Sequence, residues 1–381
     1  MTYRSFLFFL LTSFHLYLYS QPYQIGSRQM TFTDPSRVRD IATYVYHPSL
    51  QAGTNQQFAS GSFPLIIFGH GFSMNYNAYL NFVDSLVPLG YIIVFPTTEV
   101  GPIPFPNHED FGFDLKFLNS YIKAQNNEAS SFFYQHVTST SAIMGHSMGG
   151  GCSFLASQNN SEITTMVTFA PAETNTSAIT AATGITVPAL VFSGENDGVT
   201  LPVENHIPMY NNLSSSCKTF VNIIGGGHCY YALSNFACDF GESTSSPQPT
   251  ITRTQQQQAV FKLLIPYLDF YLNSNSLSEI IFLIRLQSMT EITYERDCLS
   301  SIQNTETNKI GLYPIPCDKY IQIPHEFSMP CNITIFDISG KKISDEGINN
   351  RTIDISSLNS GYYLLLINCN SKFHSFKIIK N

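Results

Sequence analysis

Short, continuous apolar runs alternate with longer mixed stretches between residues 31 and 270. The run at 91–95 is apolar throughout, as expected of a central parallel strand that is buried on both faces. This alternation predicts an α/β fold with a mostly parallel sheet flanked by helices, whose ligands bind beyond the carboxyl ends of the strands. We predict strands at 42–46, 65–68, 91–95, 141–144, 165–169, 189–193 and 219–224, and helices at 110–123, after 147 and at 255–271.

From about residue 310 the pattern changes to short segments with alternating apolar positions. Such segments lie at 332–337 and 361–366, and turn residues recur between them, which favours a small β-sandwich. The polar stretch 301–309 separates the two patterns. We therefore predict a larger α/β domain over 21–303, a linker over 304–311 and a β-sandwich over 312–381.

The amino terminus has the pattern of a targeting segment. Arg4 supplies a positive charge, residues 5–19 form an almost uncharged apolar run, and Ser20 offers a small residue for cleavage. A membrane anchor is the alternative, but a spanning helix needs about 20 apolar residues. We predict a signal peptide over residues 1–20 and an exported protein.

Composition narrows the kinds of partner. Charged residues make up 12% of the 381 residues and the net charge is −8, without a long run of like charges. This excludes an electrostatic footprint for nucleic acid and favours apolar or uncharged substrates. No Cys-x-x-Cys or His-x-x-x-His spacing occurs, so we expect no metal site. We also expect no cofactor, and a monomer.

Export makes the eight cysteines informative, because disulfides form in oxidising compartments. Cys217, Cys229 and Cys238 lie close together in sequence, and Cys298 falls near the end of the larger domain. We predict disulfides within this group, with the pairing left open, and a buried thiol at Cys152.

The segment Gly145-His146-Ser147-Met148-Gly149 carries the strongest chemical signal. It follows an apolar run and precedes small residues that can open a helix, the arrangement of a nucleophile elbow. A Gly-x-Ser-x-Gly match arises by chance in about one such chain in ten, so an ordinary glycine-rich turn is the alternative. To act as a nucleophile, Ser147 needs a base, an orienting carboxylate and an oxyanion hole.

Candidates for the acid and the base follow in the chain order serine, acid, histidine. Asp197 lies in the loop after the strand at 189–193, with Glu195 as the rival acid and an ordinary surface loop as the alternative. His228 follows three glycines after the strand at 219–224, so it can turn back towards the serine. We predict that His228 is the general base and that Asp197 orients its ring.

The oxyanion hole needs two backbone amides aimed at the developing charge. Met148, the residue after the candidate nucleophile, supplies one. Phe72, in the glycine-bounded loop after the strand at 65–68, supplies the other, and its ring would line the acyl pocket. His70 and His146 lie in similar loops near the site, and we assign both a structural role.

These motifs resemble those of the cutinase-like polyester hydrolases, a group that includes bacterial poly(ethylene terephthalate) hydrolases. Dienelactone hydrolases and chlorophyllases are more distant relatives. The similarity covers roughly residues 23–273. It rests on the elbow at 145–150, on 187–192 leading into 195–197, on 207–210 and on 225–228. The resemblance implies an α/β-hydrolase fold.

The resemblance also implies roles for individual residues. It assigns a triad to Ser147, Asp197 and His228, and an oxyanion hole to Phe72 and Met148. It assigns substrate contacts to Phe72, Met148, Ala172 and Tyr230.

The chain departs from the family pattern at two places that bear on aromatic substrates. Polyester-degrading members often carry tryptophan where this chain has His146 and Ala172, and the chain contains no tryptophan. This weakens an aromatic clamp for a terephthalate ring. Tyr210, Tyr230 and Tyr231 are the candidates that could partly replace it.

The tail has its own resemblance. Its Tyr-Pro-x-Pro opening at 313–316, the turn at 336–341, the Gly-Tyr-Tyr strand at 361–363 and the late lysines resemble the type IX secretion sorting domain of Bacteroidetes-type bacteria. A carbohydrate-binding or adhesive β-module is the alternative. The resemblance implies export to the medium or the cell surface, with the secretion machinery as a partner.

The leading hypothesis is a secreted serine carboxylic-ester hydrolase that acts through an acyl-enzyme on apolar or aromatic esters, with polyesters among the candidates. One alternative is a lipase or another acyl-ester hydrolase of chlorophyllase-like or dienelactone hydrolase-like type. A third hypothesis is a catalytically silent hydrolase fold that serves as a surface-binding protein.

Overall fold

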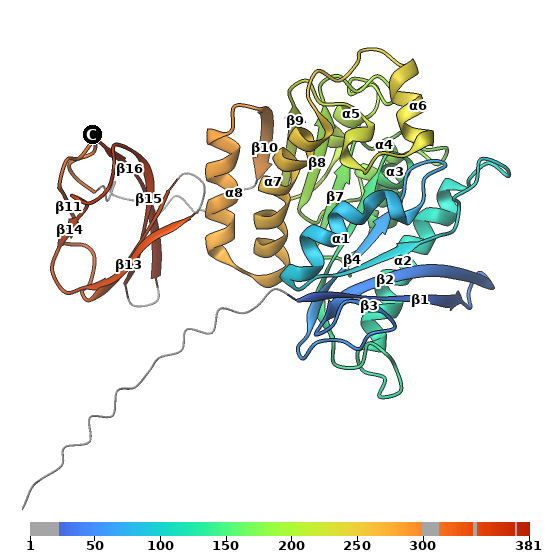
Figure 1. Cartoon of the computed structure of the whole chain (residues 1–381), viewed down its shortest axis with the longest axis horizontal. Helices are drawn as coiled ribbons and strands as arrows, with labels where there is room; N and C mark the ends of the chain where they lie inside the picture. Colours follow the sequence, from blue (N-terminus) through green and yellow to red (C-terminus); the bar gives the residue numbers. More distant parts are fainter. Residues whose placement is uncertain (1–22, 299–311, 338–340, 370–371) are drawn as a thin grey trace, which may run out of the picture.

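The computed structural model describes residues 23–298, 312–337, 341–369 and 372–381. The predicted signal peptide at 1–20 and the predicted linker at 304–311 lie outside these residues. A large α/β unit comes first, and small antiparallel sheets lie beyond it, beside helix α8 (Ser276–Ser288) (Figure 1). Within the described ranges, no helix combines the length and apolar character that crossing a bilayer requires.

A ten-stranded mixed sheet forms the centre of the α/β unit. Its strands are β1 (Gln24–Asp34), β2 (Arg39–Ser49), β3 (Gly53–Thr54), β4 (Phe63–Gly69), β5 (Ile92–Pro96), β6 (Val137–His146), β7 (Thr165–Phe169), β8 (Ala189–Gly194), β9 (Cys217–Ile223) and β10 (Ile292–Cys298). They lie in the order β10-β9-β8-β7-β6-β4-β5-β2-β1-β3. The strands from β5 to β9 pair in parallel, whereas β1 with β2, β2 with β5 and β9 with β10 are antiparallel. The predicted α/β class with a mostly parallel sheet is confirmed.

Helices cover both faces of this sheet. They are α1 (Leu80–Leu86), α2 (His108–Gln125), α3 (Met148–Ser157), α4 (Ala178–Ala182), α5 (His206–Asn212), α6 (Phe236–Thr244), α7 (Arg253–Asn273) and α8, with short 3-10 segments η1 (Tyr76–Tyr79), η2 (Val87–Leu89) and η3 (Cys229–Tyr231). Alternate residues of a strand point to opposite faces. Accordingly, Ile66 and Phe68 of β4 pack with α1, α7 and α8, whereas Leu65 and Ile67 pack with α2 and α3.

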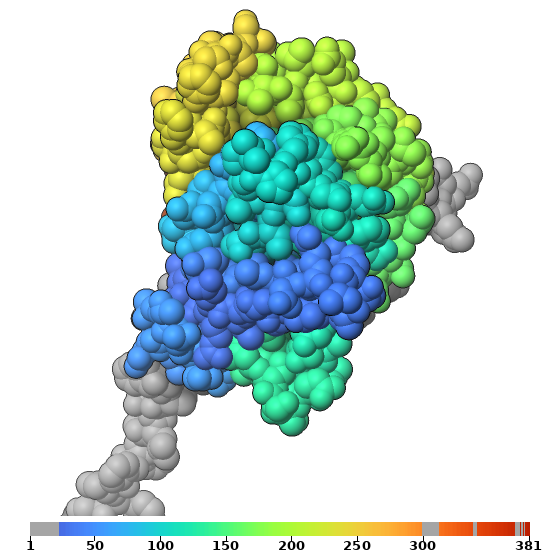
Figure 2. Space-filling model, turned by 90° about the vertical axis from the view of Figure 1, so that its right-hand side faces the viewer, coloured from blue at the N-terminus to red at the C-terminus, as the bar shows by residue number. Residues whose placement is uncertain are grey.

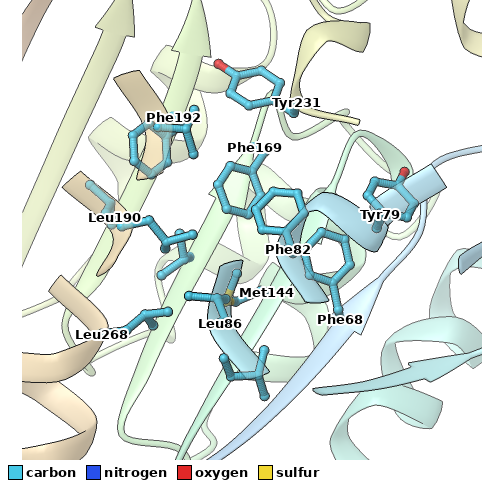
Figure 3. Packing of buried hydrophobic residues seen from close by; sticks show 14 of the residues in the cluster. Phe68, Tyr79, Phe82, Leu86, Met144, Phe169, Leu190, Phe192, Tyr231 and Leu268 are labelled. Atoms are coloured by element: carbon cyan, nitrogen blue, oxygen red, sulfur yellow. The ribbon is translucent and has the colours of Figure 1, made fainter. Parts of the chain in front are cut away.

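Aromatic rings fill the face beneath α1 and α7. Phe82 of α1 packs on Phe169 of β7 with ring centroids 4.9 Å apart, and Phe169 stacks on Phe192 of β8 at 5.4 Å (Figure 3). Tyr231 of η3 lies 5.7 Å from Phe169. Burying an apolar side chain of this size stabilises the fold by about 1.5–3 kcal/mol. This row of rings therefore anchors the loop that carries His228.

The observed strands match the predicted ones within a few residues, but the sequence pattern does not reveal the two ends of the unit. β1 carries many exposed polar residues because it lies near a sheet edge, so it is not an apolar run. α8 and β10 follow the last helix that we predicted for the unit, at 255–271. β10 covers the edge of β9, and its outward residues are also polar.

Disulfides link three pairs of the described cysteines: Cys217–Cys298, Cys229–Cys238 and Cys331–Cys369. The first ties β9 to β10, and the second joins η3 to α6. The predicted disulfides of the larger unit are present, and Cys152 is a buried, unbonded thiol.

The C-terminal part contains β11 (Tyr320–Gln322), β12 (Cys331–Asp337), β13 (Lys342–Ile348), β14 (Thr352–Asp354), β15 (Gly361–Cys369) and β16 (Lys372–Lys380). Four of these strands form a sheet in the order β13-β12-β15-β16, and β11 pairs with β14. Its main apolar cluster contains only residues from Leu312 onwards. A second, smaller cluster joins Phe336, Leu364 and Leu366 to the apolar side chains of α8.

We propose that residues 312–381 form a domain that folds apart from residues 21–303. A chain of residues 21–305 should then unfold cooperatively. Its midpoint should lie within about 4 °C of that of the α/β unit in the full chain, because we expect the deletion to change the free energy of unfolding by about 1 kcal/mol. Circular dichroism during heating measures this. Because deletion exposes Leu277, Ile280 and Ile284, the matched short chain with Ile280→Gln should be more soluble. A short chain without a cooperative transition would contradict the proposal.

Candidate active site

A sharp turn between β6 and α3 presents Ser147. Its backbone has φ 56° and ψ −121°, outside the regions that most side chains adopt. The turn is possible because its neighbours have no side chains: a Cβ on Gly145 would collide with the Gly149 backbone, and one on Gly149 with the Gly69 backbone. The amide of Ser147 donates to the Phe169 carbonyl at 3.0 Å, which holds the turn against β7.

The structure brings the three predicted triad residues into contact. His228 Nε2 lies 2.9 Å from Ser147 Oγ, and His228 Nδ1 lies 2.8 Å from Asp197 Oδ2. All three side chains are buried. Glu195, the rival acid, is exposed and accepts a hydrogen bond from the Gly225 amide instead. Asp197 is therefore the acid that contacts the ring.

Backbone and side-chain donors hold the Asp197 carboxylate. Its Oδ1 accepts hydrogen bonds from the amides of Val199 at 2.9 Å and Thr200 at 2.7 Å. Burial favours the neutral acid, but the charge of the His228 imidazolium and its hydrogen bond outweigh burial, so the pKa of Asp197 is lowered. Burial likewise opposes a charged His228, but the charge and hydrogen bond of Asp197 raise the pKa of His228. The pair is thus set to hold a carboxylate beside a histidine that readily takes a proton.

Two side chains from distant helices fix the backbone around His228. The Glu242 carboxylate of α6 accepts from the amides of His228 and Cys229 at 3.2 and 2.5 Å. The Gln256 amide of α7 bonds both the N–H and the C=O of Gly227 at 2.9 Å. The disulfide Cys229–Cys238 joins the same loop to α6. Neither Glu242 nor Gln256 stands out in the sequence, because each acts through the backbone of a loop far away along the chain.

His146 connects three parts of the site. Its Nε2 lies 2.9 Å from the carbonyl oxygen of His228, so this nitrogen is the donor, and its Nδ1 then accepts from the Tyr79 hydroxyl at 3.0 Å. Tyr79 in turn accepts from the Gly71 amide at 2.8 Å. Burial holds the pKa of His146 well below its ordinary value, so the ring is neutral. This arrangement fits the structural role that we predicted for His146.

A cavity of about 220 Å³ opens beside Ser147. Three residues predicted at the site, Phe72, Met148 and Ala172, line it together with Phe105, His108 and Glu173. The rings of Phe72 and Phe105 lie 5.5 Å apart. The segments around 105 and 172, far apart in sequence, meet at the surface in teal and green (Figure 2). The sequence pattern gives no signal for Phe105, His108 or Glu173, because the cavity exists only once these segments meet.

None of the three candidate tyrosines lines this cavity. Tyr230 lies under the Arg253 guanidinium, 4.7 Å from the ring centroid, and does not line the cavity. Tyr210 packs in the cluster beneath α4 and α5, and Tyr231 in the aromatic row. The rings that line the cavity are those of Phe72, Phe105 and His108.

Met148 and Phe72, the predicted oxyanion donors, both line the cavity beside Ser147. Met148 is the first residue of α3, where an amide has no carbonyl of its own helix to bond. Phe72 is 41% exposed and lines the same cavity as Ser147. Among the described residues, no three His, Cys, Asp or Glu side chains gather as metal ligands would.

The mostly parallel sheet, the turn that presents Ser147, and the order serine, acid, histidine define the α/β-hydrolase class. Residues 108–243, which include Ser147, Asp197 and His228, match the family described as PET hydrolase-like. Residues 311–381 match the secretion system C-terminal sorting domain. The chain thus combines a PET hydrolase-like segment with a sorting domain, and the resemblances stated from the sequence are confirmed. The sorting domain indicates type IX secretion, and a protein that is secreted or displayed at the cell surface of a Bacteroidetes-type bacterium.

Two curated relatives are similar over 114 residues. Cutinase 1 of Thermobifida cellulosilytica is 31% identical over 29% of this chain and 42% of its own length. The cutinase of Thermobifida fusca (strain YX) is 31% identical over 29% of this chain and 36% of its own length. The match thus spans about two fifths of the length of these relatives.

We expect the pKa of His228 to lie above the ordinary histidine value of 6.5. Burial instead lowers the pKa of His206 to about 4, so His206 stays neutral at higher pH. As pH falls through the raised pKa, His228 becomes a cation and can no longer accept a proton. Asp197→Asn removes the stabilising charge and should lower the pKa of His228. NMR titration of 13C-labelled histidines measures these values. A wild-type His228 that titrates below pH 6.5 would refute the assignment.

Proposed function

We propose that this protein is a secreted serine carboxylic-ester hydrolase of cutinase type. The single observation that carries the proposal is the continuous contact from Asp197 Oδ2 through the His228 ring to Ser147 Oγ, at 2.8 and 2.9 Å, at the wall of an open cavity. The similarity of residues 108–243 to PET hydrolase-like proteins and cutinases supports the same class of reaction.

The geometry fits a two-step acyl transfer. His228 Nε2 removes the hydroxyl proton as Ser147 Oγ attacks the ester carbonyl carbon, and the carbonyl electrons move onto oxygen. When the carbonyl re-forms, the bond to the alcohol breaks and His228 returns the proton to the leaving oxygen. Water then repeats the sequence on the acyl-enzyme and releases the acid. Throughout, Asp197 holds the ring orientation and stabilises the imidazolium.

The backbone amides of Phe72 and Met148 are the donors that we assign to the oxyanion. Each such donor contributes about 3 kcal/mol to transition-state stabilisation. The amide of Met148 also lies at the positive end of the α3 dipole, which favours a negative charge at this point. These donors are part of the proposal, as are the catalytic roles of the triad residues.

The cavity favours esters of compact, uncharged acids. Its wall combines the Phe72 and Phe105 rings with Met148 and Ala172, and its size suits an aromatic ring or a short acyl chain. The half-buried Glu173 carboxylate disfavours a substrate that would bring a second negative charge into the cavity. Aromatic polyesters are therefore candidates, and a lipase that prefers long acyl chains is the alternative. A monomer without cofactor remains a prediction.

A catalytically silent, surface-binding hydrolase fold is the remaining alternative. It gives no reason for a buried carboxylate, imidazole and hydroxyl to line up beside a cavity, since burying such groups is costly. Labelling with a fluorescent phosphonate separates the two, because an activated serine reacts and an inert one does not.

Ser147→Ala and His228→Ala should each lower kcat by about 10⁴-fold or more with the fold intact, because each removes a group that reacts. Asp197→Asn should be nearly as damaging. The matched control is Glu195→Gln, two residues away and exposed, which should keep wild-type activity. Hydrolysis of p-nitrophenyl acetate measures all four. Activity retained in Asp197→Asn and lost in Glu195→Gln would show that the acid is wrongly assigned.

Phe105→Ala should raise KM for p-nitrophenyl benzoate about tenfold more than it raises KM for p-nitrophenyl acetate. The reason is that it removes one of the two phenylalanine rings, Phe72 and Phe105, that would contact the benzoyl ring. Ile103→Ala is the control: it lies on the same loop, is 91% exposed and does not line the cavity. Kinetics on acetate, benzoate and palmitate esters give the comparison. A preference for palmitate that Phe105→Ala leaves unchanged would favour the lipase alternative.

A further inference from the structure

A second imidazole lies behind the triad carboxylate. His206, the first residue of α5, has its Nε2 3.0 Å from Thr200 Oγ1 and 3.7 Å from Asp197 Oδ2. Its Nδ1 lies 2.8 Å from Ser193 Oγ at the end of β8. His206 and Ser193 are fully buried, and Thr200 is 8% exposed. None of these three residues takes part in the mechanism described above.

Thr200 lies at the centre of this group. Its hydroxyl is 3.0 Å from Asp197 Oδ2, 3.0 Å from His206 Nε2 and 2.9 Å from His228 Nδ1. A hydroxyl has one proton to donate and two lone pairs that accept. The three near neighbours match its full capacity, provided that two of them are donors; the Ala170 carbonyl, at 3.5 Å, is a more distant acceptor.

The directions of these hydrogen bonds follow from the acceptors. The carboxylate can only accept, and it is the strongest acceptor near Thr200, so the hydroxyl donates to Asp197. His228 Nδ1 carries a single proton, which it donates to Asp197 Oδ2 at 2.8 Å and shares with Thr200 Oγ1 at 2.9 Å. His206 Nε2 must then be the second donor, and its Nδ1 accepts from the Ser193 hydroxyl. The result is a one-way chain of neutral donors from Ser193 through His206 and Thr200 to Asp197.

We propose that Thr200 is a positioning residue of the triad, and that His206 acts through it by directing the Thr200 hydroxyl proton onto Asp197. The inference rests on the proposed function for its catalytic consequence. In this arrangement Asp197 Oδ1 is held by two amides, and Oδ2 by His228 and Thr200. The carboxylate cannot rotate without breaking the chain, so the His228 ring keeps its aim at Ser147.

His206 suits this role because it is neutral. Burial lowers its pKa to about 4, so over the pH range in which His228 titrates His206 adds no second positive charge beside it. The other titratable groups facing His228 are Asp197, Glu242 of α6 and His146 of β6, and Tyr231 of η3 lies against His146. Substitutions at positions 200 and 206 change none of these side chains. A change in the pKa of His228 therefore reports on the hydrogen bonds that run from His206 through Thr200 to Asp197.

The sign of that change can be worked out. The Thr200 hydroxyl withdraws negative charge from Oδ2, which lowers the pKa of His228, while its lone pair near Nδ1 acts in the opposite direction. The bond to the charged carboxylate is the stronger of the two, because charge-assisted hydrogen bonds are roughly twice as strong as neutral ones. Removing the hydroxyl should therefore raise the pKa of His228.

The experiment compares Thr200→Val, which replaces the hydroxyl with a methyl group, with Thr200→Ser, which keeps the hydroxyl and removes the methyl group. We expect Thr200→Val to lower kcat for p-nitrophenyl acetate about tenfold with KM unchanged, and to move the acid limb of kcat/KM to higher pH. KM should not change because Thr200 does not line the cavity. Thr200→Ser should restore the wild-type limb. If Thr200→Val only lowers stability in urea and leaves the acid limb of the pH profile of kcat/KM where it is in the wild type, the proposal is overturned.

His206 is tested through a double-mutant cycle. His206→Phe removes both ring nitrogens, whereas His206→Gln keeps an N–H donor near Thr200. We expect His206→Phe to raise the pKa of His228 in the wild-type background and to have no further effect in the Thr200→Val background. His206→Gln should behave more like the wild type. Full additivity of the two substitutions would show that His206 does not act through Thr200.

NMR titration of His228 in the same variants can be measured whether or not the protein hydrolyses an ester. If the wild-type chain hydrolyses none of the esters, the proposed function fails, and the titration still decides whether the chain of hydrogen bonds reaches His228. If His206→Phe alone folds, its titration carries the test: an unshifted His228 overturns the proposal, and a raised pKa supports it.

Discussion

Ser147 is held in a backbone conformation that would be unfavourable in isolation, and the architecture of the site depends on that turn. Residues in such regions cost on the order of 1–3 kcal/mol and persist only where their surroundings determine them. Here the amide of Ser147 bonds to β7, and its carbonyl accepts from Ala172 at 2.9 Å. Close backbone contact at Gly149 brings β4 against α3. The same contacts place the hydroxyl, the first amide of α3 and the cavity wall relative to one another.

Around this turn, the electrostatics are a balance between burial and pairing. Burial alone would make Asp197 neutral and prevent His228 from taking up a proton, yet the pair shifts each pKa the other way. The balance holds because every oxygen of the carboxylate has donors, most of them uncharged. Neutral donors satisfy a buried carboxylate without adding a cation that would compete with the imidazolium. Glu242 and Gln256 do the equivalent for the backbone of the histidine loop.

Local motifs explain how far the sequence could be interpreted. The turn at Ser147 and the glycines before His228 depend on neighbouring residues, so their pattern is visible along the chain. The central strands are visible because both of their faces are apolar, whereas β1 and β10 are partly exposed and resemble loops. Phe105 and His206 could not be predicted, since their surroundings arise from chain crossings and from side-chain directions. Tyr230 shows the converse: proximity to His228 in sequence did not place it in the cavity.

The buried path from Gly71 through Tyr79 and His146 to the His228 carbonyl has a consequence for how the protein loses activity. It joins the loop of Phe72, the serine turn and the histidine loop into one cooperative unit, so none of them can open alone without leaving a buried polar group unpaired. Fluctuations that expose His228 therefore also displace Phe72, one of the two oxyanion donors that we propose. Such a unit is either fully assembled or fully open. Partly assembled forms, which would react slowly or with the wrong compound, are therefore sparsely populated.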